Sequence, residues 1–554
     1  MKQHHKLTLA LCGIWAATIL YGEMLAFWVP SLWSCSWPHL HHLPRSSANT
    51  MINGVGSGSD YVKVAVIADP QLMDRTSLRL PPKSFALETA QFYTDLYMRR
   101  AFFSSIRPFK PDVILFLGDY FDGGPFLSDQ EWQESLHRFR HIFGMNTDGR
   151  YTDIQVYFIP GNHDIGYASI NSHHPEVVRR YVERFGIRNF QFTVGKVEFI
   201  AVDAQTLDGR PRENLASVTW EFVKNVSTDI QLVPRVLLSH IPLYRRHDTY
   251  CGSYRSSPII NQAISYSALS GEIKYQNYVT EESSYKLLEL VKPALILSGH
   301  DHDQCTVVHE SNFGSITEHT LGTISWQQGN LYPSFMLLSV SNSATANVSI
   351  PEDLLISQLC FLPWQTHIYI WYISLFVLTL LTLLFWPTSG VSFGHHLSGL
   401  MECLRHYGSM FRGEKDKNED ENCEYEMMWD AEGAMHLVKK VVDTSISRTS
   451  DKASVERCFI SAFSSAFVNS TKGNAVIRPT ARKNISQEGE ISMNLDINAD
   501  VGNDPSIKLP SRISKSKTRI IIQRLMRTFR MVTVIAAVNV PIYMMLLFKD
   551  WIDQ

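Results

Sequence analysis

Apolar residues along this chain gather into runs of two lengths. Three long runs occupy residues 7–29, 367–386 and 531–548, and each approaches the ~20 residues that cross a hydrocarbon core of about 30 Å. We therefore predict three transmembrane helices. For the first run, the alternative is a cleaved signal peptide, and Glu23 is expected to reach the interface rather than act as a functional intramembrane acid. For the third run, which contains Pro541, the alternative is a buried or re-entrant helix.

The shorter runs are rich in β-branched residues and alternate with amphipathic segments. Strand-like runs lie at residues 62–68, 113–117, 154–159, 197–202, 235–238 and 294–297. Helical spacing is found at residues 84–106, 128–143 and 174–185. Three further strands are expected at residues 307–309, 315–321 and 335–340. This alternation predicts an α/β core with buried sheets.

Composition divides the chain between these elements. Residues 46–60 are rich in Ser, Gly and Asn, and residues 411–517 combine a mixed charge run with Ser-, Lys- and Asn-rich sequence. The second stretch is expected to be largely disordered, with a short helix near residues 434–442. The predicted regions are an N-terminus at 1–6, a signal anchor at 7–29, a linker at 30–60, the α/β domain at 61–345, a stalk at 346–366, the second span at 367–386, a loop at 387–530, the third span at 531–548 and a tail at 549–554.

Charge indicates how the spans are oriented. The formal net charge is −3, which gives no electrostatic case for binding nucleic acid. Lys2 and Lys6 precede the first span, and a series of basic residues between 508 and 530 precedes the third. The positive-inside rule places both flanks in the cytosol. The α/β domain then lies in the lumen, where Asn225 and Asn347 are candidate glycan acceptors.

Four cysteines fall in the predicted luminal region: Cys35, Cys251, Cys305 and Cys360. An even number in an oxidising compartment indicates disulfides, although three connectivities are possible. Cys35 and Cys360 each lie near a span, so a bond between them would join the two ends of the domain. We favour this pairing, together with Cys251–Cys305.

Polar motifs follow the predicted strands. They occupy residues 68–71 (ADPQ), 118–124 (GDYFDGG), 161–164 (GNHD), 239–240 (SH) and 298–302 (SGHDH). A strand fixes the backbone of the residues at its end, which suits groups that must be held in place. Carboxylate, amide and imidazole ligands at successive strand ends are typical of a two-metal hydrolytic centre.

These motifs closely resemble those of the calcineurin-like metallophosphoesterase superfamily, over about residues 62–340. The resemblance implies a four-layer αββα sandwich with a pair of metal ions at the strand ends. It implies this set of metal ligands: Asp69, Asp119, Asn162, His240, His300 and His302. Asp119 would bridge two ions, with Asp69 and His302 at one ion and the remaining three residues at the other. His163, oriented by Asp122, would stabilise or protonate the leaving oxygen.

One motif departs from this superfamily. The usual Asp-x-His is here Asp69-Pro70-Gln71. Gln71 could bind an ion weakly, through water, or not at all, and this harder site favours Mn²⁺ or Mg²⁺ over Zn²⁺. The alternative is a catalytically dead protein that has lost a ligand.

A narrower resemblance is to the membrane-bound phosphodiesterases that remove ethanolamine phosphate from the mannoses of GPI anchors. It rests on residues 35–38 (CSWP), 69–71 (DPQ), 240–246 (HIPLYRR), 325–326 (SW) and 333–335 (PSF). It implies an Mn²⁺-dependent enzyme that acts on GPI-anchored proteins in the ER or early Golgi, during export.

Arg245 and Arg246 are candidates for contacting the phosphate, and surface ion pairs are the alternative for both. Two other functions remain open. One is a generic membrane-bound metallophosphoesterase acting on another phosphoester, and the other is a non-catalytic trafficking receptor that binds a glycan. A protein phosphatase is disfavoured, because Asp122 is followed by Gly-Gly and His163 by Asp164.

Overall fold

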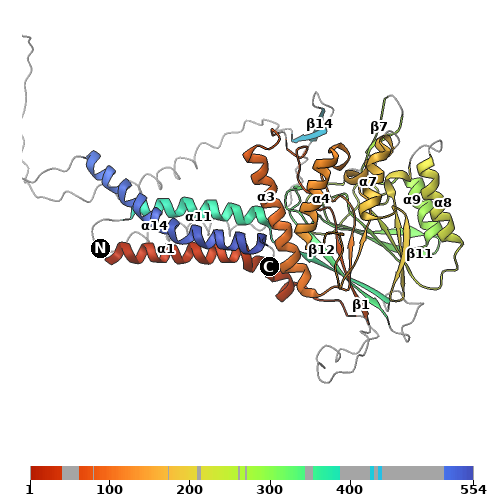
Figure 1. The fold of residues 1–554 in the computed structure, drawn as a ribbon, viewed down its shortest axis with the longest axis horizontal. Helices are drawn as coiled ribbons and strands as arrows, with labels where there is room; N and C mark the ends of the chain where they lie inside the picture. Colours follow the sequence, from red (N-terminus) through yellow and green to blue (C-terminus); the bar gives the residue numbers. More distant parts are fainter. Residues whose placement is uncertain are drawn as a thin grey trace, which may run out of the picture. The chain divides into compact units, whose positions relative to one another are not determined.

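The computed structural model describes residues 2–39, 61–78, 80–171, 174–208, 214–259, 263–268, 271–342, 354–386, 425–429, 435–439 and 517–552. Two mixed β-sheets form the centre of the domain, which lies between the first two long apolar helices in the sequence (Figure 1). The five-stranded sheet has the order β13-β12-β1-β2-β3, with β1 at Tyr61–Ile67, β2 at Val113–Phe116, β3 at Gln155–Phe158, β12 at Ser334–Ser341 and β13 at Leu355–Phe361. The six-stranded sheet has the order β10-β11-β9-β6-β5-β4, with β4 at Phe190–Val194, β5 at Val197–Val202, β6 at Arg235–Ser239, β9 at Leu295–Ser298, β10 at Cys305–Ser311 and β11 at Gly314–Thr320.

Helices cover the outer face of each sheet. The first sheet packs against α3 (Phe85–Arg100, continuing as a π-helical segment over Ala101–Ile106), α4 (Asp129–Phe143) and α7 (Pro175–Phe185). The second packs against α8 (Asn214–Thr228) and α9 (Glu281–Val291). Shorter elements are α5 (Asn162–Ile165), α6 (Ala168–Asn171), the hairpin of β7 (Ile264–Tyr266) with β8 (Ile273–Gln276), and 3-10 turns at Arg107–Phe109, Gly124–Phe126 and Ala204–Thr206.

The central strand β1 shows why its sequence is apolar throughout. Ala65 and Ile67 face the helices of the first outer layer, whereas Val64 and Val66 pack against the second sheet. Because both faces of the strand are covered, its apolar residues do not alternate with polar ones. The layers are therefore helix, sheet, sheet and helix, which confirms the predicted αββα sandwich.

Helix α4 illustrates how local sequence fixes an element within this scaffold. Ser128 and Glu131 form a capping box that starts the helix, and Gly144, with φ 62°, ends it in the left-handed region. The helix turns Trp132 and Phe139 into the core against the first sheet. Its bounds agree with the 128–143 pattern to within one residue.

Two expectations outside the core of the domain differ from the structure. The stretch 346–366 contains the half-buried strand β13, which pairs with β12 and is therefore more than a stalk. Residues 434–442 contain β15 (Met435–Lys439), paired with β14 (Tyr425–Trp429), where we expected a helix. A nine-residue helix gains little from its own hydrogen bonds, whereas β14 supplies pairing partners for Met435–Lys439. The remainder of 387–516 lies outside the described residues.

Three helices are long and apolar enough to cross a membrane, at residues 4–34, 365–385 and 521–551. The first comprises α1 (Lys2–Leu20), a π-helical segment (Tyr21–Leu25), α2 (Ala26–Val29) and a second π-helical segment (Pro30–Ser34); the others are α11 (Gln365–Phe385) and α14 (Lys517–Trp551). The first and second are joined by a hydrogen bond of 3.1 Å from Trp15 Nε1 to Thr379 Oγ1. Helix α14 begins well before residue 531 because a basic, polar segment can continue a helix that hydropathy alone does not detect.

The end of α3 meets the ends of these long helices (Figure 1). Arg100 lies between Glu23 of the first helix, with which it forms an ion pair, and Asp550 of α14, whose Oδ2 is 2.7 Å from Arg100 Nε. Tyr372 of α11 donates a hydrogen bond of 2.8 Å to Glu23. We call Glu23, Arg100, Tyr372 and Asp550 the junction cluster, because it links all three long helices to the domain.

Candidate metal centre

Six predicted ligands converge where strands of both sheets end. Asp69 follows β1, Asp119 follows β2 and Asn162 begins α5 after β3. From the second sheet, His240 follows β6, and both His300 and His302 follow β9. Parallel strands carry their carboxyl ends to one edge of a sheet, and two facing sheets bring two such edges together. The topology therefore gathers residues that are up to 233 positions apart in sequence.

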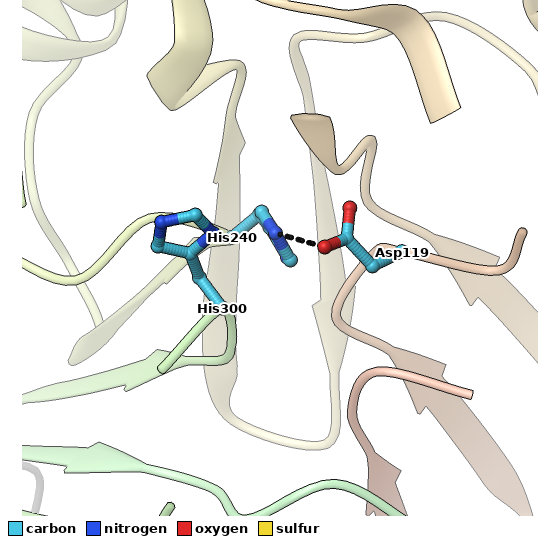
Figure 2. Close-up of side chains that lie close together, drawn as sticks. All are labelled: Asp119, His240 and His300. Carbon is cyan, nitrogen blue, oxygen red and sulfur yellow. Dashed lines mark ion pairs between the residues drawn. The ribbon is translucent and has the colours of Figure 1, made fainter. Parts of the chain in front are cut away.

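Two groups of three ligands share one carboxylate. Asp119, His240 and His300 form one group, and Asp69, Asp119 and His302 form the other; within each group the ligand atoms all lie within 4.8 Å of one another. Figure 2 shows Asp119 facing His240, with His300 beside it; His240 Nε2 is 3.1 Å from Asp119 Oδ2. A shared carboxylate flanked by two sets of ligands is the arrangement that holds two neighbouring cations.

Hydrogen bonds turn the histidine lone pairs toward the centre. His240 Nδ1 donates to the Leu117 carbonyl over 2.7 Å, so its Nε2 faces Asp119 and lies 3.1 Å from Asn162 Oδ1. His300 Nε2 donates to the Gln276 carbonyl over 3.0 Å. The Nδ1 atom of His300 is buried and has no hydrogen-bond partner among the described residues. Such an orphaned acceptor, held in place by the bond at the other ring nitrogen, fits a metal ligand.

Burial also keeps two of these imidazoles in the form that binds metals. It lowers the pKa of His300 to about 3 and the pKa of His302 to about 4. Both rings are therefore neutral at physiological pH and retain a lone pair. Imidazole nitrogen combined with carboxylate and amide oxygen suits Mn²⁺, Zn²⁺ or Fe ions, so the residues present fit a pair of divalent cations.

The backbone is strained at the ligands themselves. Asp69, Asp119, His300 and His302 have φ values of 50°, 55°, 68° and 56°, in the left-handed region that few residues other than glycine adopt, although asparagine, aspartate and histidine are found there more often than most. Strain of this kind persists where the surrounding structure fixes it, and it clusters at functional sites. Here it turns each ligand back across the end of its strand.

Two glycines make room for the ligands. Gly118 has φ +97°, and a Cβ there would lie 2.6 Å from Nδ1 of His240. A Cβ on Gly161 would collide with the carboxylate of Asp119. Each motif glycine is thus required by the neighbouring ligand rather than by the turn alone.

Gln71 occupies the position of the missing histidine. Its side chain is buried, and Nε2 donates a hydrogen bond of 3.2 Å to Asp119 Oδ2. In this orientation Gln71 supplies a donor to the shared carboxylate instead of a lone pair to an ion.

His163 is held beside the centre and opens onto a cavity. Its backbone N–H donates to Asp119 Oδ1 over 2.8 Å, and its Nδ1 donates to the main-chain carbonyl of Asp122. The carboxylate of Asp122 is farther away, with Oδ1 at 3.6 Å from Nδ1. Burial lowers the pKa of His163, but attraction to Asp119 and the bond to Asp122 outweigh it, and the net shift is upward. The ring can therefore carry a proton to the cavity.

Asp164 is a supporting residue that motif reasoning did not single out. Its carboxylate accepts hydrogen bonds from the backbone N–H groups of Asp119 and Tyr120 at 2.8 Å and of Gly161 at 2.9 Å. It thereby joins the loop after β2 to the loop after β3. Its place at the end of the GNHD motif was the available signal.

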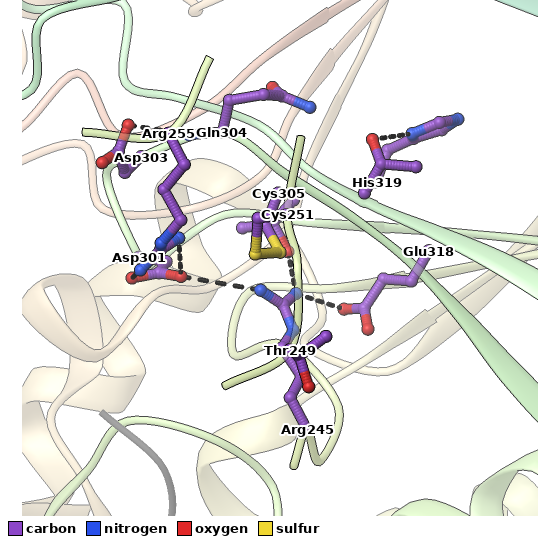
Figure 3. The surroundings of a disulfide bond; sticks show 12 residues. Arg245, Thr249, Cys251, Arg255, Asp301, Asp303, Gln304, Cys305, Glu318 and His319 are labelled. Carbon is purple, nitrogen blue, oxygen red and sulfur yellow. Dashed lines mark hydrogen bonds and ion pairs between the residues drawn. A yellow bond between two sulfur atoms is a disulfide. The ribbon is translucent and has the colours of Figure 1, made fainter. Parts of the chain in front are cut away.

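The two candidate arginines do not line the cavity. Arg245 is buried between Glu318 and Asp301, at 3.4 and 3.6 Å, beside the Cys251–Cys305 bond (Figure 3). Arg246 is exposed elsewhere on the same loop.

Both disulfides have the pairing that we favoured from the sequence. Cys251 is bonded to Cys305, and Cys35 is bonded to Cys360 across 325 residues of sequence. The second bond ties the end of the first long helix to β13, immediately before α11.

A cavity of about 420 Å³ opens beside the ligands. Its lining includes Asn162, His163, His300 and His302 from the ligand loops. Its other walls include Tyr167, Lys274, Tyr275 and Asn277. A phosphoester bound at the centre would extend into this space.

Comparison with known proteins agrees with this geometry. The family described as calcineurin-like phosphoesterase matches residues 62–304. Metallophosphoesterase 1 of Danio rerio is 30% identical over 312 residues, which cover 52% of this chain and 74% of that protein. Metallophosphoesterase 1 of Ailuropoda melanoleuca is 28% identical, covering 65% and 88%, and Cell division control protein 1 of Saccharomyces cerevisiae is 27% identical, covering 63% and 68%. Among solved structures, Vacuolar Protein Sorting 29 of Cryptosporidium parvum aligns with 55% of this chain and 98% of its own at 12% identity and a TM-score of 0.21, too low to support an inference.

Proposed function

The chain belongs to the calcineurin-like phosphoesterase family, and from this premise we propose that it removes ethanolamine phosphate from the mannose of GPI anchors. The family makes it a metal-dependent phosphoester hydrolase. The observation that carries the proposed phosphodiesterase activity is the pair of ligand groups sharing Asp119, with His163 lining the same cavity as ligands of both groups.

The roles of the side chains follow from their positions. Two bound divalent ions would polarise the phosphate and activate a water molecule. Asp69, Asp119, Asn162, His240, His300 and His302 would hold those ions. His163, oriented through Nδ1 by the Asp122 carbonyl, presents Nε2 as a general acid for the leaving sugar oxygen.

We propose Mn²⁺ as the natural ion. The presence of the amide of Gln71 at the usual histidine position reduces the number of nitrogen ligands, which favours harder cations. The hydrogen bond from Gln71 to Asp119 also withdraws some negative charge from the shared carboxylate. Both effects weaken the preference for Zn²⁺.

The membrane helices support a substrate that is itself anchored in a membrane. An enzyme and a lipid-linked substrate held in one plane meet at a raised effective concentration. Trp33, Trp364 and Trp551 lie at the end of the first long helix, directly before α11 and at the end of α14, where interfacial aromatic residues are expected.

We propose that the domain lies in the lumen of the ER or Golgi. Two disulfides suit an oxidising compartment, and the basic residues that flank the spans favour this orientation. The candidate acceptor Asn225 is exposed on α8, whereas Asn347 lies outside the described residues. Glycosidase treatment should reduce the mass of the protein from cells and leave an Asn225→Gln, Asn347→Gln protein unchanged.

Two experiments test the function. Full-length protein in detergent should hydrolyse an aryl phosphodiester with Mn²⁺, lose this activity in chelator and regain it when Mn²⁺ is restored. Mass spectrometry of GPI glycans should reveal retained ethanolamine phosphate in cells lacking the gene, corrected by the wild-type chain but not by His163→Ala. Aryl ester hydrolysis with an unchanged glycan pattern would reject the GPI substrate and leave a phosphoesterase of another specificity.

A further inference from the structure

The hairpin of β7 and β8 forms a wall of the cavity without contributing a metal ligand. It is a separate two-stranded sheet between β6 and α9. Lys274 and Tyr275 line the cavity from β8, a strand that carries none of the motifs proposed to hold the ions. These side chains are therefore available for contacts with a substrate bound at the centre.

The next residue fixes the hairpin to the metal centre. The carbonyl oxygen of Gln276 accepts hydrogen bonds from His300 Nε2 at 3.0 Å and from the Tyr167 hydroxyl at 2.9 Å. The Gln276 side chain is buried and bonds to Asp208 and to the Tyr278 carbonyl. Lys274 and Tyr275 are thus held within two residues of a group that touches a ligand, so their distance from the centre is set by the fold.

The exposed ring on this wall is suited to a sugar. Tyr275 is 47% exposed, and its ring meets that of Tyr167 edge to face, with centroids 6.1 Å apart. The edge contact orients the Tyr275 ring. A fixed aromatic ring can stack on the apolar face of a pyranose, and a pair of rings next to a phosphoester site fits a phosphorylated sugar.

Lys274 supplies the matching charge. Among the described residues that line the cavity, it is the one lysine or arginine, and it has no hydrogen-bond or ion-pair partner in the described parts of the chain. A lysine ammonium is a flexible point charge with three donors, and here it faces a space next to a site for phosphate.

We propose that the hairpin is the substrate-recognition element of this site, with Tyr275 stacking on the sugar that bears the phosphate and Lys274 pairing with the phosphate oxygens. The inference rests on the proposed phosphoesterase function and names the side chains that would select a sugar phosphodiester. Tyr275 acts on the sugar alone, whereas Lys274 acts on any phosphate that reaches the centre.

The test compares two ligands on full-length, Mn²⁺-loaded protein in detergent, by calorimetric titration. Inorganic phosphate reports the metal centre, and mannose 6-phosphate reports the centre together with the sugar contact. Tyr275→Ala should weaken the affinity for mannose 6-phosphate about tenfold and leave the affinity for inorganic phosphate unchanged. Tyr275→Phe should retain both affinities. Tyr266→Ala is the matched control, because Tyr266 is exposed on the same hairpin but lies outside the cavity lining.

Lys274→Ala should weaken the binding of both ligands about fivefold at low salt. The ratio of the variant's dissociation constant to that of the wild type should fall toward one at 1 M salt. Lys224→Ala, at an exposed position of α8, should change neither. An equal loss of affinity for both ligands in Tyr275→Ala would overturn the sugar contact, and so would unchanged affinity for both. Failure of the wild-type protein to bind either ligand would instead overturn the proposed phosphoesterase centre, and the inference with it.

Discussion

The metal centre and the junction cluster both bury charged side chains, but they balance those charges differently. In the junction cluster the guanidinium of Arg100 lies between the carboxylates of Glu23 and Asp550. In the metal centre Asp69 and Asp119 are fully buried among histidines, and the Nδ1 atom of His300 has no partner among the described residues. In the first cluster each charge faces an opposite one, and the buried atom of Arg100 that lacks a hydrogen-bond partner among the described residues is a donor, Nη2. The second has acceptors to spare, which is what a site for cations requires.

The difference also appears in the backbone. Four of the six proposed ligands of the metal centre have positive φ values, whereas Arg100 has a helical backbone with φ −62°, where α3 passes into its π-helical segment. A cluster that only stabilises the fold can use helical positions. A cluster that must direct several lone pairs to the same point accepts strained turns to do so.

The largest expected effect on the metal centre comes from changing the shared carboxylate of Asp119. Asp119→Asn should lower the phosphodiesterase kcat/KM by about 10³-fold or more, because it removes the carboxylate ligand common to both groups. Metal analysis should show fewer than two Mn²⁺ ions per chain. Full metal content with lost activity would contradict the bridging role.

Replacing the proposed acid separates binding from catalysis. His163→Ala should lower kcat by about 10²–10⁴-fold, since the leaving oxygen loses its proton donor. Because His163 is not a proposed ligand, the protein should still bind two Mn²⁺ ions, as measured by the same metal analysis. A leaving group of low pKa should recover part of the rate, whereas unchanged activity on an alkyl diester would exclude the role.

Removing the ion pairs of the junction cluster should destabilise the protein without affecting metal binding. Arg100→Ala leaves the buried carboxylate of Glu23 and the partly buried carboxylate of Asp550 without their counter-charge, at a cost of about 3–5 kcal/mol in the free energy of unfolding. Denaturation in detergent should report this loss, and Mn²⁺ content per folded chain should stay the same. Arg75→Ala is the control, because the Arg75–Glu131 pair is exposed and should contribute less than about 1 kcal/mol.

A third buried cluster, around Glu318 and Arg245, can be tested through the pH dependence of stability. Burial raises the pKa of Glu318, but Arg245 and the hydrogen bonds from His309 and Ser298 lower it to about 2 overall. A carboxyl with a depressed folded-state pKa contributes stability that is present above its unfolded value and lost as pH falls toward about 2. The stability difference between wild type and Glu318→Gln should therefore shrink between pH 5 and pH 3. A difference that is constant over this range would show that Glu318 does not titrate as a closed pair.

The sequence pattern predicted an α/β core with polar motifs at strand ends, because buried strands and glycine-flanked motifs leave local patterns, whereas the four-layer sandwich was implied by the resemblance to the superfamily. Residues 197–202 were expected as a strand and form β5 with those bounds. The contact from Gln276 to His300 could not be predicted, since a main-chain carbonyl carries no residue signature. The pairing of Arg100 with Asp550 spans 450 residues and involves ordinary charged positions, so only the fold reveals it.

The bond between Cys35 and Cys360 has a consequence for how such a protein can change over evolution. The two Cα atoms are 5.8 Å apart, so the chain enters and leaves the intervening domain at nearly one point. Topologically, the whole domain is an insertion between two long apolar helices, which are the proposed membrane spans. A module with adjacent ends can be exchanged, enlarged or permuted without reshaping its host, so the anchor and the catalyst are free to diversify separately.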